Sequence, residues 1–240
     1  HANVAYNVGA IQLLFPITPD DRSLSFLPWA HIFGQSCELH GFISIGASMG
    51  IAESVDTIME NLAEVRPTFL CAVPRIFNRI YDTLHQRMET DGGVTKALFE
   101  AAIANAEKRK KLASRRQSSG ATDLRHAFYD RAVFSKIRAR FGGRLRYAIS
   151  GGAALSREVG EFIDNLGMLV YEGYGLSETS PIVSANYPGA RKMGSVGKVI
   201  PGVEVEIDTT VTGDPKNGEI VVFGHNVMQG YYNLPEEDAK

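Results

Sequence analysis

The feature that most constrains this fold is an alternation of short apolar segments with helical patterns over the first 180 residues. The apolar segments have the length and composition of buried strands. They cover residues 23–29, 47–52, 68–73, 144–149 and 168–171. Strands that alternate with helices form a mainly parallel sheet whose connections cross over as helices. The sequence therefore predicts a layered α/β sheet domain with helical crossovers.

Helical patterns fill the gaps between these strands. Pro74 stands where a helix can begin, because its missing N–H is not needed at the first helical position. Ser156 is an expected N-cap, and Glu158 lies favourably in the first turn that follows. Further helices are expected over residues 32–45 and 127–141. A fifth is expected over 55–65, with 3.6-residue spacing at Val55, Ile58, Met59, Leu62 and Val65.

Residues 92–126 differ in character from the rest of the chain. An apolar helical stripe comes first and a polar, basic stretch follows it. We expect a surface helical hairpin with a mobile tip. The basic run at 107–116 is most simply a solvated helix face, and the alternative is attraction to an anionic membrane surface. The stripe consists of Val94, Ala97, Leu98 and Ala101.

The helical pattern stops beyond residue 180. Residues 203–207 and 219–223 alternate or run apolar like strands, and turn-forming residues separate them at 213–218. We therefore expect residues 1–180 to form the α/β part and residues 181–240 to form a small C-terminal β subdomain.

Charge and cysteine content exclude several classes of protein. The 25 Lys and Arg against 27 Asp and Glu give a net charge of −2, which argues against nucleic acid as a partner. The most apolar stretch, residues 41–52, falls short of the roughly 18 residues of a membrane span. Cys37 and Cys71 are expected as reduced core residues, and no basic leader follows His1. These features favour a cytoplasmic location, with any membrane contact peripheral.

Three segments follow expected strands at their carboxyl ends, which is the edge where open α/β sheets bind ligands. They are residues 27–34, 150–155 and 171–181. The second, Ser-Gly-Gly-Ala-Ala-Leu, resembles half of a phosphate-binding nest before a helix, although many turns carry Gly-Gly. In the first, His31 could donate to a phosphate or carboxylate oxygen, or could be an ordinary core histidine. Walker and dinucleotide-binding motifs are absent from the sequence. The Gly-x-Ser-x-Gly pattern at 46–50 overlaps an expected strand and is not at the strand-to-helix turn that a nucleophile elbow requires.

The third segment carries the most chemistry. Gly173 and Gly175 allow close approach of backbone to a ligand, and Tyr174 between them could stack on a base. Ser177 offers a hydroxyl, and Glu178 is a hard oxygen ligand suited to Mg²⁺. This set suits a magnesium nucleotide, although a glycine-rich turn with Tyr and Glu can also be purely structural.

Residues 174–181, Tyr-Gly-Leu-Ser-Glu-Thr-Ser-Pro, resemble the central motif of adenylate-forming (AMP-binding) enzymes, usually Tyr-Gly-x-Thr-Glu. Four other segments resemble the family in the same order: 27–34, 150–155, 194–205 and 218–232. Within the family, residues 66–81 and the long hairpin look like those of long-chain fatty acid–CoA ligases. The resemblance implies the acyl-CoA synthetase-like N-terminal domain.

The resemblance also implies a two-step reaction with ATP, Mg²⁺, a fatty acid and coenzyme A. The carboxylate attacks the α-phosphate and releases pyrophosphate, and the thiol of coenzyme A then displaces AMP. Catalysis would rest on donors and a metal ion aimed at the developing charge. Tyr174 would stack on adenine, Ser177 would hold phosphate and Glu178 would bind Mg²⁺.

The remaining roles carried over from the family concern the walls of the site. The backbone of Gly151, Gly152 and Ala153 would line the adenine and acyl pocket, and Gly175 would add backbone to the nucleotide site. His31 would lie near the reacting carboxylate and phosphate. Trp29 would border the acyl tunnel.

The sequence departs from the family pattern in several places. Ser177 replaces the more common Thr and keeps the hydroxyl. The family's phosphate loop, expected before His1, is absent, and so are the ribose-binding Asp and the C-terminal lysine domain, expected after Lys240. We therefore expect an interior fragment of a larger enzyme that does not turn over alone. A fatty acyl-AMP ligase, an aryl or amino acid activator, and a non-catalytic acyl- or nucleotide-binding relative are the alternatives.

Overall fold

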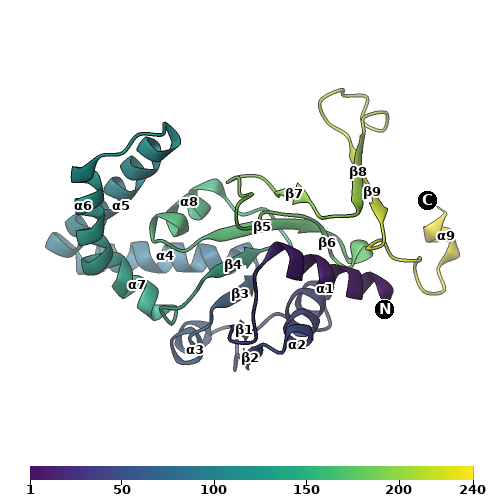
Figure 1. Cartoon of the computed structure of the whole chain (residues 1–240), viewed down its shortest axis with the longest axis horizontal. Coiled ribbons are helices and arrows are strands. Elements are labelled where there is room, and N and C mark those ends of the chain that lie inside the picture. Colours follow the sequence, from purple (N-terminus) through teal and green to yellow (C-terminus); the bar gives the residue numbers. More distant parts are fainter. Residues whose placement is uncertain (240) are drawn as a thin grey trace.

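A seven-stranded sheet forms the centre of the computed structural model, which describes residues 1–239. Its strand order is β2-β1-β3-β4-β5-β6-β7, with the first five strands parallel and the last two antiparallel to their neighbours (Figure 1). The strands are β1 (Arg22–Ser25), β2 (Ser48–Ile51), β3 (Phe69–Ala72), β4 (Tyr147–Ser150), β5 (Val170–Gly175), β6 (Ile182–Ala185) and β7 (Lys198–Val199). The expected layered α/β fold is confirmed.

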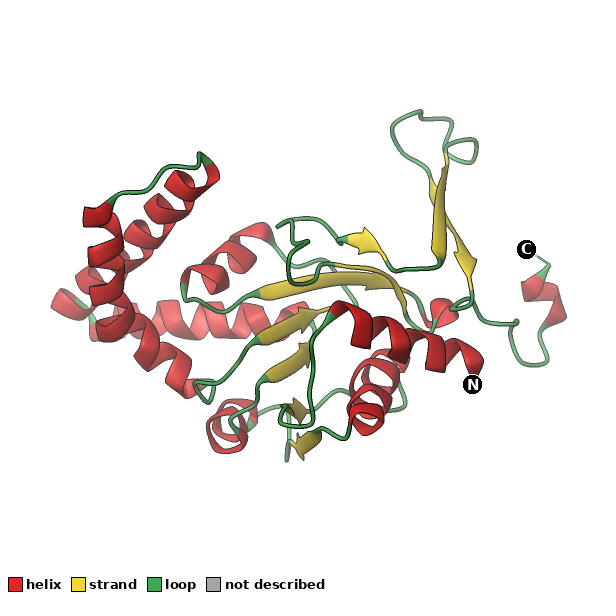
Figure 2. Ribbon diagram, in the orientation of Figure 1, coloured by secondary structure: helices red, strands yellow, loops and turns green. Residues whose placement is uncertain are grey.

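Helices cover both faces of this sheet (Figure 2). Strand β3 shows why, since Leu70 and Ala72 pack into one apolar core while Phe69 and Cys71 pack into another. One face carries α1 (Ala2–Leu14), the π-helix η1 (Phe33–His40) and α2 (Gly41–Ile45). The other face carries α3 (Ile58–Val65), α4 (Pro74–Asp91), α5 (Gly93–Ser114), α6 (Gly120–Tyr129), η2 (Asp130–Phe134), α7 (Ser135–Arg140) and α8 (Arg157–Asn165).

Local sequence signals placed several helix starts correctly. Helix α4 begins at Pro74, and the Ser156 hydroxyl caps α8 by accepting from the N–H of Val159 at 3.2 Å. The expected helix at 55–65 starts later, at Ile58, and Val55 lies outside it with 56% of its surface exposed. Ser54 and Thr57 bond to each other's backbone and side chains there, which favours a turn over a helix.

The hairpin exists, but its expected apolar stripe was wrong. Val94 is 85% exposed, and the buried stripe of α5 is instead Phe99, Ala102 and Ala106. The Phe99 ring packs 6.1 Å from that of Phe162 on α8, and this large side chain sets the rotation of the helix. The returning arm begins at residue 120, where the Ser119 hydroxyl accepts from the backbone of Thr122.

The glycine-rich segment after residue 171 is part of a strand and not a turn. Strand β5 runs to Gly175 and pairs antiparallel with β6, with a bulge between Tyr174 and Gly175. The main sheet therefore continues across residue 180. A separate two-stranded ribbon consists of β8 (Val203–Asp208) and β9 (Glu219–Gly224). The short helix η3 (Ser177–Thr179) lies between β5 and β6, and the short helix α9 (Pro235–Asp238) follows the ribbon.

Candidate active site

A cavity of about 330 Å³ opens at the carboxyl edge of the sheet, where β4 and β5 end. We call it the edge cavity. Its volume lies at the lower end of the range typical of small-molecule sites. Among its lining residues are His31, Gly151, Gly152, Tyr174, Gly175, Ser177 and Glu178. The structure thus brings together most of the candidates from the sequence, whereas Trp29 and the exposed Ala153 are not on the wall.

The edge cavity has a polar side and an apolar side. The polar side carries His31, Ser177 and Glu178 together with the glycine backbone. The apolar side includes Ile11, Phe15, Phe33, Cys37, Phe69 and Cys71. Such a site suits an amphiphilic ligand with a charged head and a hydrocarbon body.

Close packing requires glycine at one position on the wall and favours it at a second. A side chain at Gly175 would lie 1.8 Å from the carbonyl oxygen of Pro181, so only glycine lets the strand meet the loop that follows. A side chain at Gly151 would lie 3.1 Å from the ring of Phe33. Both positions therefore have a structural reason for glycine beside any role with a ligand.

Two buried asparagines hold residues 176–182, which we call the motif loop. Asn7 on α1 donates to the carbonyl of Thr179 at 3.1 Å and accepts from the N–H of Ile182 at 2.8 Å. Asn226 donates to the carbonyl of Ile182 at 2.8 Å. Asn7 and Asn226 are both fully buried. The loop is thus fixed by side chains distant in the sequence, and such support keeps reactive groups in place.

Glu178 is held at both its backbone and its carboxylate. The N–H of Met228 donates to its carbonyl at 2.7 Å, and the hydroxyl of Tyr231 donates to its Oε1, also at 2.7 Å. The hydrogen bond from Tyr231 lowers the pKa of Glu178, so the carboxylate is ionised at neutral pH.

One ionised carboxylate fits the way in which Mg²⁺ accompanies a nucleotide, because the ion keeps several waters and takes phosphate oxygens as ligands. Among residues 1–239 no three His, Cys, Asp or Glu side chains gather into a preformed metal site. Glu178 would therefore share the ion with the bound phosphates.

His31 and Ser150 present polar atoms at the same edge. His31 Nδ1 accepts from the N–H of Phe33 at 3.2 Å, which leaves Nε2 as the donor. The Ser150 hydroxyl lies on the cavity wall, is buried, and has no hydrogen-bond partner. A buried hydroxyl without a partner at a cavity wall points to a ligand or a water there.

Trp29 lies outside the edge cavity in a buried polar network. Its indole N–H donates to the Ser25 hydroxyl at 3.0 Å, and Ser25 and Ser23 donate to the two carboxylate oxygens of Glu38. Glu38 is fully buried, and loss of hydration raises its pKa to about 7. Trp29 therefore links the loop before His31 to a carboxyl group beneath the sheet.

The two cysteines are buried and unpaired, as expected from the sequence. Burial raises the pKa of Cys37 to about 12, so this thiol is not a nucleophile near neutral pH. Burial also raises the pKa of the Cys71 thiol.

A protein-family model described as AMP-binding enzyme matches residues 1–232. The chain belongs to the AMP-binding enzyme family. It is 35% identical to long chain acyl-CoA synthetase 7, peroxisomal, of Arabidopsis thaliana, over 99% of this chain and 34% of that protein. It is 32% identical to the long-chain-fatty-acid–CoA ligase FadD15 of Mycobacterium bovis, over 96% of this chain and 37% of the ligase. The chain spans about a third of the length of these curated relatives.

Solved structures agree on the fold. A malonyl-CoA ligase in a ternary product complex with methylmalonyl-CoA and AMP superimposes with a TM-score of 0.67 at 21% identity. That match covers 99% of this chain and 42% of the ligase. ATP-bound MatB from Rhodopseudomonas palustris gives 0.64 at 24% identity, over 99% of this chain and 38% of MatB.

Three residues that lie in or support the candidate site were not predicted from the sequence. Asn7 lies on the buried, otherwise apolar face of α1, where a polar residue is the signal for a buried hydrogen bond. Glu38, within the helix expected at 32–45, is likewise a polar residue on a buried helix face. Tyr231 lies in the 218–232 segment, but nothing in the sequence pairs it with Glu178.

Proposed function

We propose that the protein containing this chain activates a long-chain fatty acid as an acyl-adenylate and transfers the acyl group to coenzyme A. Family membership and relatives at about 35% identity support the coarser description, an acid–CoA ligase that forms AMP. The observation that carries the finer proposal is the edge cavity, in which Tyr174, Ser177 and Glu178 share one space with an apolar wall.

The chemistry requires a site that holds a nucleotide and a carboxylate together. In the first step a carboxylate oxygen bonds to the α-phosphorus of ATP, and pyrophosphate leaves. In the second step the coenzyme A sulfur bonds to the acyl carbon, and AMP leaves with the electron pair. Mg²⁺ on Glu178 would supply charge stabilisation to the phosphates when bound.

The chain's own residues would then bind and orient the reactants. Tyr174 would stack on adenine, Ser177 would donate to a phosphate oxygen, and His31 Nε2 would donate to the reacting carboxylate or phosphate. The backbone of Gly151, Gly152 and Gly175 would border the nucleotide. The apolar wall would take the first part of the acyl chain, with Trp29 and Ala153 farther from the reacting atoms.

The test is product formation by the full-length protein with ATP, Mg²⁺ and coenzyme A. The acids offered are fatty acids from short to very long, together with aryl and amino acids. The proposal expects acyl-CoA from long-chain acids only, and none when coenzyme A is omitted. Acyl-adenylate that forms but gives no acyl-CoA when coenzyme A is present would indicate a fatty acyl-AMP ligase. No adenylate with any acid would indicate a non-catalytic binding protein.

A further inference from the structure

A second cavity, of about 400 Å³, lies between the hairpin and the end of α8. We call it the hairpin cavity. Its walls come from α5, the hairpin tip, α6 and the residues around Asn165, and it shares no lining residue with the edge cavity. The side chains on its walls include Arg109, Lys110, Ser119, Asp123, His126 and Asp164.

The carboxylates at the hairpin cavity already have cations. Asp164 Oδ2 lies 2.6 Å from Lys110 Nζ, and its Oδ1 lies 3.1 Å from Arg191 Nη1. Asp123 is paired with Arg109 at 2.8 Å. On the cavity wall Arg109 and Lys110 are thus balanced by Asp123 and Asp164, and Arg191 adds one further cation behind Asp164.

Polar atoms without partners surround the same space. Asn165 is 5% exposed, and its Oδ1 has no hydrogen bond. The buried Nδ1 of His126 also has no hydrogen bond. Behind Asp164, Nη2 of Arg191 is also buried without a partner. Buried polar atoms normally have partners, so several around one cavity indicate a bound group. The unpartnered atom of Asn165 is an acceptor, but a turn of the amide presents its NH₂ to the cavity instead, and the His126 imidazole can donate from Nδ1. Both side chains can then serve a ligand rich in acceptor oxygens beside Lys110.

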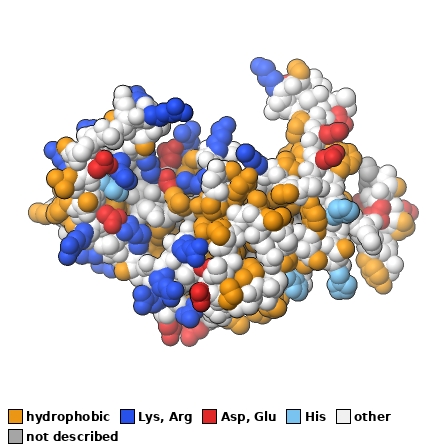
Figure 3. Space-filling model, viewed as in Figure 1, with side chains coloured by type: hydrophobic (Ala, Val, Ile, Leu, Met, Phe, Trp, Pro, Cys, Tyr) orange, Lys and Arg blue, Asp and Glu red, His pale blue; other side chains and the backbone are white. Residues whose placement is uncertain are grey.

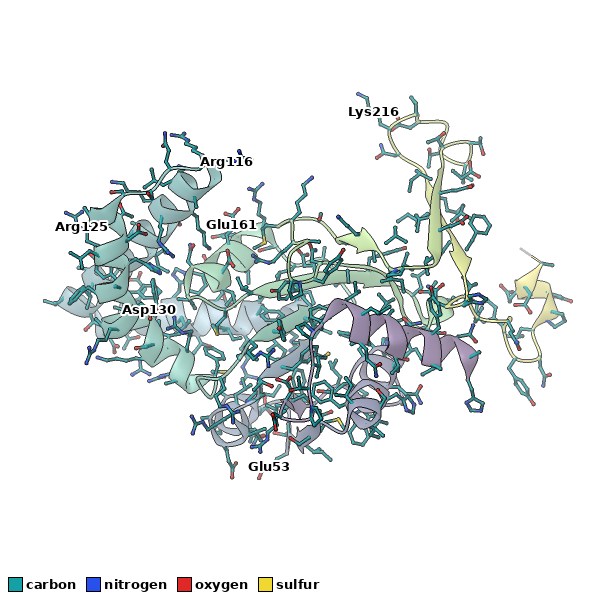
Figure 4. All side chains as sticks on the ribbon, in the orientation of Figure 1. Glu53, Arg116, Arg125, Asp130, Glu161 and Lys216 are labelled. Atoms are coloured by element: carbon teal, nitrogen blue, oxygen red, sulfur yellow. The ribbon has the colours of Figure 1, made fainter. Side chains whose placement is uncertain are left out.

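The surroundings concentrate anions at this cavity. Residues 92–141 carry 12 Lys and Arg against 4 Asp and Glu, a net charge of +8, whereas the rest of the chain carries 13 against 23. Figure 3 shows Lys and Arg side chains gathered at this end of the molecule. Arg116 lies at the hairpin tip (Figure 4), so the cavity opens beside a basic rim. Such a field raises the local concentration of anions.

We propose that the hairpin cavity binds the phosphate group of a small soluble compound. Lys110 supplies the charge, and the Asn165 amide and His126 imidazole supply directed hydrogen bonds. The position between α5, α6 and α8 lets the bound group tie the hairpin to the body of the domain. This site is separate from the proposed adenylation site, and its test does not depend on that activity.

The test is calorimetric titration of the purified full-length protein with inorganic phosphate. Lys110→Met is expected to weaken phosphate binding by about tenfold, the loss of one charge-assisted hydrogen bond, while Asp164 keeps Arg191 as its partner. The matched control is Lys111→Met, which removes the same charge from an exposed neighbour and should change the affinity by less than about twofold.

A second variant separates binding from folding. Asn165→Leu removes an amide whose oxygen has no partner, so it should leave the melting temperature unchanged. It also removes the amide nitrogen that would donate to phosphate, so it should weaken phosphate binding severalfold. An equal loss in Lys110→Met and Lys111→Met would overturn the proposal, because it would indicate general charge attraction. Phosphate binding unchanged in both cavity variants, or seen only on vesicles of phosphatidic acid, would also overturn it.

Discussion

At the scale of single residues, the contact between Tyr231 and Glu178 is the most directly testable feature of the edge cavity. Tyr231→Phe removes the hydroxyl that donates to Oε1 and keeps the ring. We predict a three- to tenfold loss (about that of one hydrogen bond) in the apparent affinity for Mg²⁺, with kcat at saturating Mg²⁺ little changed. Titration with Mn²⁺, followed by electron paramagnetic resonance in the presence of ATP, measures the affinity without turnover.

The adjacent tyrosine is a matched control for this prediction. Tyr232 is 91% exposed, and Tyr232→Phe should leave the Mg²⁺ affinity unchanged. Equal behaviour of the two variants would show that the hydroxyl of Tyr231 does not position Glu178.

Glu38 makes a prediction about pH and stability. Its pKa rises from 4.5 to about 7 on folding because burial disfavours the charged form. The folded state therefore holds a proton that the unfolded state has lost, and stability falls as pH rises from 4.5 to 7. This loss amounts to about 3 kcal/mol.

Glu38→Gln removes the titration and keeps one accepting oxygen, while the serine facing the new amide nitrogen accepts a hydrogen bond from it. We predict that the variant gains stability over the natural protein between pH 4.5 and 8, by up to the same amount. Urea unfolding at both pH values measures the difference, and Glu64→Gln on the exposed side of α3 is the control. A stability difference that does not vary with pH would mean that Glu38 is ionised throughout.

At the scale of elements, helix α1 supports the motif loop through one side chain. Asn7→Ala would leave the carbonyl of Thr179 and the N–H of Ile182 buried without partners. We predict a loss of about 2–4 kcal/mol in the free energy of unfolding, together with lower activity. Gln12→Ala on the exposed side of the same helix should cost less than about 0.5 kcal/mol. A similar small cost for Asn7→Ala would contradict the supporting role.

Elements with strong local signals could be predicted from the sequence, and those set by distant packing could not. β3 is a short apolar run between a Pro-stopped helix and Pro74, and α8 has its cap at Ser156, so both lie where expected. The stripe of α5 failed because the aromatic contact of Phe99 with Phe162 decides its rotation. Gly173–Gly175 suggested a turn, yet pairing with β6 makes them a strand.

The residues of the candidate site also fall into two groups: those close together in the sequence, and those that only the tertiary fold brings to the site. Tyr174, Ser177 and Glu178 lie within five residues of sequence and meet at one edge because they occupy the end of β5 and the short helix η3 that follows it. Three other side chains contact the motif loop only because of the tertiary fold: Asn7, Asn226 and Tyr231. Each forms a hydrogen bond to a loop residue that is 44 to 175 positions away in the sequence. The geometry of η1, which turns Glu38 toward β1, likewise has no local signal.

At the scale of the whole molecule, charge separates along the long axis. The hairpin end is basic and the remainder is acidic, with the β8–β9 ribbon at the opposite end (Figure 1). Leu124 and Phe128 are also exposed on α6, at 75% and 60%. Among the described residues no helix is both long and apolar enough to cross a bilayer.

We propose that the hairpin end contacts anionic membranes peripherally. In the basic run at 107–116, Arg109 and Lys110 are engaged in ion pairs, Lys108 and Lys111 are exposed along the helix, and Arg115 and Arg116 are the two exposed charges at the tip. Neutralising both should weaken sedimentation with phosphatidylserine vesicles by roughly tenfold or more at low salt. Lys216, at the tip of the ribbon (Figure 4), is the control. Binding that is absent, or equally sensitive to Lys216, would exclude this contact.

The measurement that tests the central claim most directly is ATP–pyrophosphate exchange by the full-length protein and its Glu178→Ala variant. The account predicts exchange that long-chain fatty acids stimulate, that Glu178→Ala abolishes, and that Glu206→Ala on the exposed ribbon leaves intact. Exchange of normal rate in Glu178→Ala, or no exchange with any acid in a folded protein, would contradict the assignment of the edge cavity as an adenylation site.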